Sequence, residues 1–92
     1  MTGDNGGMQR FELESLKNLG PVSSRQLQAV GIETIEQLEK AGPVKAFHLV
    51  ADLFPGETSV TFLYALQGAL LDLPLGEIPE RDKERLRDEA RG

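Results

Sequence analysis

The chain has 92 residues, a net charge of −5, no cysteine and one histidine. This length supports one domain with one modest core, and the lack of cysteine excludes disulfides, thiolate catalysis and cysteine zinc sites. The longest apolar stretch, 60–75, is interrupted by polar residues and falls short of the roughly 20 apolar residues that a membrane-spanning helix needs. We therefore expect a soluble, cytoplasmic protein with no membrane partner.

The acidic balance argues against general nucleic-acid binding. Residues 1–78 carry the whole net charge of −5, whereas the basic and acidic residues of 79–92 cancel. Affinity for DNA or RNA comes largely from Lys and Arg side chains that neutralise phosphates. The charge therefore disfavours nucleic acid as a partner.

The chain begins with a glycine-rich segment. Residues 1–9 have neither the basic segment nor the apolar run of a signal peptide, so we predict a flexible tail followed by one helical domain over residues 10–92. Apolar residues at helical spacing then predict a first helix over 10–18, ended by the breaker Gly20-Pro21.

Two capping-box patterns follow along the chain. Ser23 and Gln26 predict a second helix that runs to about Val30, with Gly31 as its left-handed C-terminal cap. Thr34 and Gln37 predict a third helix that ends near Gly42.

Three further helices complete the prediction. Pro43 suits the first position of a fourth helix, stopped by Pro55-Gly56. A fifth helix over 60–71 is apolar on most sides, which is typical of a central helix. A last helix over 80–90 carries opposite charges at i,i+3 and few apolar residues, so we expect it to be frayed and solvent-exposed. No segment alternates as a strand does, so we predict an all-α bundle of five to six short helices.

A weak internal repeat supports a more specific architecture. Residues 16–29 align with 38–51, so that Gly20-Pro21-Val22 matches Gly42-Pro43-Val44. A helix, a glycine turn and a second helix form the pattern of a helix-hairpin-helix motif, in which amides at a helix N-terminus approach a DNA phosphate. The candidate nucleic-acid contacts of the two copies are Gly20, Ser23, Arg25, Gly42 and Lys45.

The same turns are also explained by packing alone. A second glycine is expected two residues after the first, and Val22 and Val44 occupy those places. Each copy has one nearby cation, Arg25 or Lys45, whereas tight phosphate binding needs several.

Three segments resemble the C-terminal domain of the TfoX family of competence regulators. They are Leu16-Lys17-Asn18-Leu19-Gly20-Pro21, Val30-Gly31-Ile32-Glu33-Thr34 and Leu63-Tyr64-Ala65-Leu66-Gln67-Gly68-Ala69-Leu70. The resemblance covers about 14–86 and implies a helix-hairpin-helix-like fold, similar to the sterile alpha motif, in a bacterial protein linked to DNA transformation. Full-length members carry an N-terminal domain before this one, which we expect to be absent here.

Few single residues suggest chemistry. His48 has no second histidine or cysteine beside it, so we expect a structural role rather than a metal or catalytic one. Tyr64 fits a core or interface position, and Gly68 costs its helix about 1 kcal/mol relative to alanine, which indicates a close approach by another helix or a partner. Tyr64 and Gly68 are therefore the candidate interaction surface.

These observations favour a non-enzymatic regulatory or protein-interaction module. We expect a protein partner or self-association, and no cofactor, metal, catalytic residue or small-molecule substrate. The alternative is a DNA-binding helix-hairpin-helix module that contacts phosphates through the Gly20 and Gly42 turns.

Overall fold

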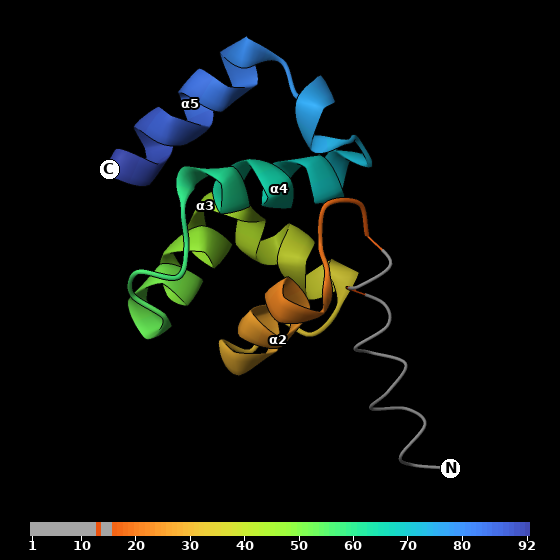
Figure 1. Ribbon diagram of the computed structural model, residues 1–92, viewed down its shortest axis with the longest axis vertical. Helices are drawn as coiled ribbons and strands as arrows, with labels where there is room; N and C mark the ends of the chain where they lie inside the picture. Colours follow the sequence, from red (N-terminus) through yellow and green to blue (C-terminus); the bar gives the residue numbers. More distant parts are fainter. Residues whose placement is uncertain (1–12, 14–15) are drawn as a thin grey trace.

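The computed structural model describes residue 13 and residues 16–92 (Figure 1). The described residues form four α-helices and one short 3-10 helix, η1, with no strand. In chain order these are α2 (Pro21–Ala29), α3 (Ile35–Leu53), α4 (Val60–Leu71), η1 (Leu75–Glu77) and α5 (Glu80–Arg91). The predicted tail, 1–9, lies outside the described residues. The all-helical fold class is thus confirmed for the described part of the chain.

The last residues of the first predicted helix, which spans 10–18, are not helical. Residues 16–18 form a bend and a turn, and Asn18 has a left-handed φ of 71°. The rest of that helix lies outside the described residues, apart from Leu13, which is buried in the core.

The prediction of five to six helices is not confirmed by the described residues, among which α3 spans both the third and the fourth predicted helices. Gly42 interrupts α3 with a non-helical φ of 82° and ψ of 161°, a conformation that glycine tolerates best. Pro43 then starts the second half without a loop, since its missing N–H and fixed φ suit the first turn of a helix. The predicted boundary at Gly42 is therefore a kink, and the helix-hairpin-helix architecture is not confirmed.

The start of α2 corrects a second prediction. Gly20 occupies the N-cap without a side-chain hydrogen bond, and Pro21 is the first helical residue. Because proline is already suited to this position, the helix begins before Ser23, which lies within its first turn. Ser23 therefore does not cap the helix.

The end of α2 matches the prediction. Gly31 is left-handed, with a φ of 89°. Its amide donates to Gln28 O at 3.0 Å, and the amide of the buried Ile32 donates to Leu27 O at 2.9 Å. These two bonds define a Schellman motif, which turns the chain back over the helix it closes.

The capping box at the start of α3 is also confirmed. Gln37 N donates to Thr34 Oγ1 at 3.1 Å, and Thr34 N donates to Gln37 Oε1 at 3.3 Å. Two amide donors that a helix N-terminus would leave unpaired are thereby satisfied.

The helix α4 is central, as its apolar composition predicts. Figure 1 shows α4 between α5 on one side and α3 with α2 on the other. Leu66 faces the larger core cluster, which includes Leu27, Leu38 and Val50, whereas Leu63 faces a second cluster beneath α5. In the described part of the chain, no helix has the length and apolarity needed to cross a membrane.

The last helix is more firmly attached than its sequence suggests. Much of α5 is exposed, as predicted, but Leu86 is only 1% exposed and packs with Leu63, Tyr64 and Ile78. A buried leucine contributes a few kcal/mol relative to an exposed one. The expectation of a solvent-exposed last helix is therefore wrong for its inner face.

Candidate interaction site

Tyr64 of α4 contacts two basic residues of α5. The residue is 9% exposed, and its hydroxyl accepts a hydrogen bond of 2.8 Å from Arg87 Nη1. The ammonium group of Lys83 lies 5.3 Å from the centre of the Tyr64 ring, within the range of a cation–π interaction. Two cations one helical turn apart therefore bind the same aromatic side chain.

The hydrogen bond to Tyr64 raises the pKa of Arg87 above its ordinary value, and Glu80 and Glu84 act in the same direction. An arginine side chain is already protonated throughout the physiological range. Arg87 thus remains a permanent positive charge at this position.

His48 holds the C-terminal end of α5. Its Nε2 lies 2.7 Å from the carbonyl oxygen of Ala90. A carbonyl oxygen can only accept, so the Nε2 atom carries the hydrogen. This contact satisfies one of the carbonyls that the last turn of a helix leaves unpaired, and it connects α3 to the end of α5.

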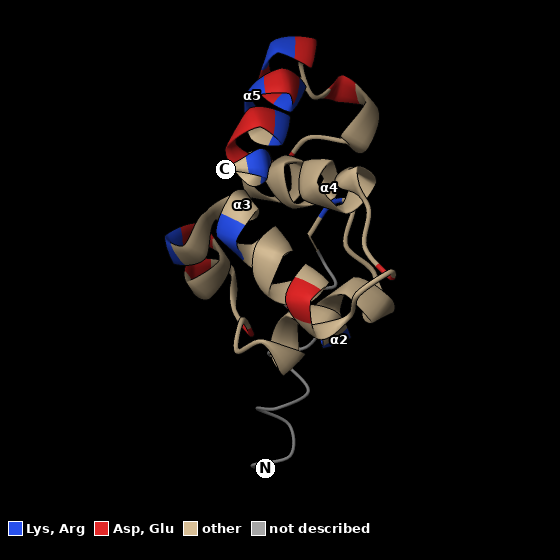
Figure 2. Ribbon diagram, turned by 90° about the vertical axis from the view of Figure 1, so that its left-hand side faces the viewer, with Lys and Arg blue, Asp and Glu red and all other residues tan. Residues whose placement is uncertain are grey.

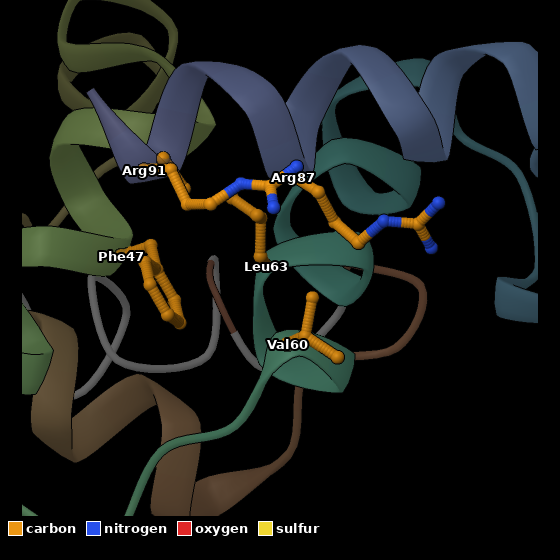
Figure 3. A pocket seen from close by; sticks show the side chains of 6 residues that line it. Phe47, Val60, Leu63, Arg87 and Arg91 are labelled. Atoms are coloured by element: carbon orange, nitrogen blue, oxygen red, sulfur yellow. The ribbon is translucent and has the colours of Figure 1, made fainter.

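Between these two contact points lies an open groove of about 350 Å³. Figure 3 shows Phe47 of α3 on one side, Val60 and Leu63 of α4 below, and the side chains of α5 above. The full lining consists of Phe47, Val60, Leu63, Arg87, Ala90 and Arg91. The groove thus has an apolar floor and a basic rim, which we call the α5 groove.

The charge around the α5 groove differs from that of the protein as a whole. Figure 2 shows acidic and basic residues alternating along α5 and no charged residue on α4. Lys83, Arg87 and Arg91 recur every four residues, which places them along one side of α5. Arg91 pairs with Asp88 at 2.7 Å. A locally basic edge therefore borders the groove in a chain whose net charge is −5.

Gly68, the other residue of the candidate interaction surface, is buried and lies away from the groove. A Cβ atom there would overlap the Asn18 side chain and lie 2.7 Å from Leu73 O. The space beside this glycine is filled by the Asn18 side chain and by the chain's own turn after α4, and not by the crossing of another helix. Tyr64 and Gly68 both face the interior, so a partner could reach Gly68 only by displacing Asn18.

The candidate nucleic-acid contacts lie on α2 and α3. Gly20, Ser23 and Arg25 belong to the N-terminal half of α2 or its cap, whereas Gly42 and Lys45 lie at the kink of α3. The two turns differ in backbone conformation, since Gly20 is extended with a φ of −115° and Gly42 has a φ of 82°.

The cations near these two turns lie on the surface. Arg25 and Lys45 are exposed, and neither forms an ion pair with another described residue. Lys17, which could add to a basic face, lies 4.0 Å from Asp72 at the end of α4. The contacts between the two glycine turns and a phosphate remain a prediction.

The sequence did not identify the α5 groove, because its lining comes from three helices. Phe47 and Val60 are ordinary apolar residues in the sequence, and the charges of the last helix resemble solvated pairs. The four-residue spacing of Lys83, Arg87 and Arg91 is the signal that could have indicated a common face.

The described residues thus form a small all-helical domain with an apolar, basic-rimmed groove beside α5. No group of three His, Asp or Glu side chains within residues 16–92 could hold a metal ion. The model of the TfoX C-terminal domain matches residues 9–90, so the chain belongs to the TfoX C-terminal domain family.

A solved structure agrees with this assignment. An uncharacterized protein from Listeria monocytogenes, crystallised in a triclinic form, superimposes with a TM-score of 0.79 at 28% sequence identity. The alignment covers 86% of this chain and 89% of that protein. None of the curated proteins compared with the chain matches it.

Proposed function

We propose that this chain is a non-enzymatic regulatory module that acts by binding another protein through the α5 groove, and that the regulation concerns competence for DNA transformation. The supporting observation is the groove itself, an apolar floor of Phe47, Val60 and Leu63 beneath two arginines. Val60 is 42% exposed although it is apolar. Apolar surface of this kind is typical of interaction sites.

The composition of the groove favours binding over catalysis. A catalytic site needs a nucleophile or an acid–base pair in mutual contact. The groove lining has apolar side chains and two arginines, which bind and orient but do not supply a nucleophile. The competence link comes from membership of the family.

Site-specific photo-crosslinking in cells of the source organism tests the binding proposal. One strain carries p-benzoylphenylalanine in place of Val60, and a control strain carries it in place of Val22, which is 66% exposed on α2. We expect a defined protein to crosslink at position 60 and not at position 22. Absence of such a product, or crosslinking only to nucleic acid, would overturn the proposal; a second copy of the chain would identify self-association.

The link to competence needs a separate measurement. Deletion of the gene should lower the frequency of DNA transformation, wild-type complementation should restore it, and the Val60→Glu variant should not. An unchanged frequency after deletion would remove the competence link, and full rescue by Val60→Glu would show that the groove is not the functional surface.

A further inference from the structure

We infer that the α5 groove binds a segment of a partner protein in which an apolar side chain is flanked by Asp or Glu residues. This inference rests on the proposed function and specifies the chemistry of the partner. It follows from the shape of the floor, the charge of the rim and the distribution of the remaining charges.

The floor of the groove favours an apolar side chain of the partner. Phe47, Val60 and Leu63 line it, together with the methyl group of Ala90. A volume of about 350 Å³ lies at the low end of the range for ligand pockets. It therefore suits one or two apolar side chains rather than a whole helix.

The two arginines of the rim favour carboxylates of the partner. Arg87 uses one donor atom, Nη1, on Tyr64, and a guanidinium has five N–H donors. Arg91 binds Asp88 through Nη2. The rim arginines thus retain donors for further acceptors, and arginine binds carboxylates with two parallel hydrogen bonds where the geometry allows it.

The opposite wall adds no competing acid. All twelve residues of α4 are uncharged, so the charges of Arg87 and Arg91 are not neutralised from across the groove. An acidic segment that entered the groove would add charge-assisted hydrogen bonds to these guanidinium groups, and each such bond contributes more than a neutral one.

A nucleic acid fits this surface less well. Its phosphates could contact the rim, but an apolar floor offers nothing to a phosphate backbone. On α5 itself, Asp82 and Glu89 are each paired with Arg85, and the whole chain is acidic. Protein carboxylates beside an apolar residue match both parts of the groove, and DNA binding is an outcome that the test can reveal.

An unbiased selection tests the inference without knowledge of the natural partner. Random dodecapeptides displayed on phage are selected on the full chain and counter-selected on its Val60→Glu variant. Val60 is the first residue of α4, where a glutamate is compatible with the helix dipole, so the variant should fold, as circular dichroism will show. We expect a consensus of Leu, Ile, Met or Phe flanked by Asp or Glu.

The selected peptide then allows the contributions of its acidic residues and of the rim arginines to be measured separately. In fluorescence anisotropy, replacing its acidic residues by Asn and Gln should weaken binding about tenfold or more, the equivalent of one lost charge-assisted hydrogen bond. Arg91→Gln should weaken the binding of the original peptide in the same direction. Arg85→Gln removes the same charge from α5 outside the groove lining and should leave the affinity within about twofold.

The outcomes separate this inference from the proposed function. A basic or purely apolar consensus, equal enrichment on Val60→Glu, or an affinity insensitive to Arg91→Gln would each overturn the inference about acidic partners. If position 60 still crosslinks to a protein in cells, the interaction function survives that result. Salt-sensitive binding of a double-stranded DNA oligonucleotide that is lost in Arg91→Gln would instead overturn the acidic-peptide assignment.

Discussion

The side chain of Asn18 occupies the space that a side chain at Gly68 would need. Asn18 Nδ2 donates to Leu73 O at 2.9 Å, and Leu75 N donates to Asn18 Oδ1, also at 2.9 Å. The left-handed Asp72 turns the chain back at the end of α4, so that Leu73 N reaches Gly68 O at 2.8 Å. Asn18 therefore connects the segment before α2 to the turn that leads into η1 and α5.

Gly68→Ala should destabilise the protein even though alanine is the better helix former by about 1 kcal/mol. The new methyl group would overlap Asn18 and lie 2.7 Å from Leu73 O, which is backbone and cannot swing aside. Overpacking of this kind typically costs 1–3 kcal/mol. Urea denaturation followed by circular dichroism measures the change. Gly76→Ala is the matched control, because a Cβ there meets nothing within 4 Å; a Gly68→Ala protein as stable as wild type would contradict the packing argument.

Two substitutions at Asn18 distinguish the stability contributed by its hydrogen bonds from the stability that depends on its backbone conformation. Asn18→Ala loses both bonds to the turn and places alanine at a φ of 71°, so we expect a loss of about 2–3 kcal/mol. Asn18→Gly loses the same bonds but accepts this φ, and should be about 1 kcal/mol less damaging. Thermal and urea unfolding of both variants provide the comparison. Equal losses of stability would show that the backbone conformation at position 18 contributes nothing. No loss in either variant would show that the contacts of Asn18 with the turn do not stabilise the protein.

Substitutions at Tyr64 and Leu86 should weaken the packing of α5 on the rest of the domain to different extents. Tyr64→Phe keeps the ring beneath Lys83 but loses the hydroxyl that accepts from Arg87, so it should cost about 1 kcal/mol. Leu86→Ala empties a fully buried position and should cost about 2–4 kcal/mol. Native-state hydrogen exchange should show faster exchange in α5 before the amides of α4 are affected. Unchanged exchange in Leu86→Ala would contradict the docked position of α5.

The two N-caps of α3 and α4 form a natural pair for a capping test. Thr34 accepts from Gln37 N in a complete capping box, whereas Ser59 makes no side-chain cap hydrogen bond. Thr34→Ala should therefore cost about 1 kcal/mol of unfolding free energy, and Ser59→Ala should cost much less. Denaturation curves of the two variants measure the difference, and equal losses would refute the distinction between the caps.

Local signals in the sequence located most helix boundaries correctly. The Thr34 capping box, the left-handed Gly31 and the limits of α4 all agree with the structure, because each depends on residues close together in the chain. The predicted cap at Ser23 failed because Pro21 starts the helix first. The break at Gly42 was predicted at the correct position. Whether the chain forms a kink or a loop there depends on how both halves of α3 pack against the core.

The contacts between distant segments could not be predicted in the same way. Gly68 stood out in the sequence by its cost to the helix, but nothing identified Asn18 as the side chain that fills the space. Arg87 and Lys83 resembled members of pairs with Glu84 and Glu80, whereas the structure places both on Tyr64. The groove follows from this docking of α5, so its lining became visible only when three helices were placed together.

The central claim is that the α5 groove is the surface that receives a protein partner. Chemical-shift mapping on the 15N-labelled protein, titrated with the peptide selected on the wild-type chain, tests it most directly. We predict the largest amide shifts at Phe47, Val60, Leu63, Ala90 and Arg91, and small shifts in the first turn of α2 around Val22 and Ser23. Shifts concentrated on α2 and on the kink at Gly42, with the groove unaffected, would contradict the claim.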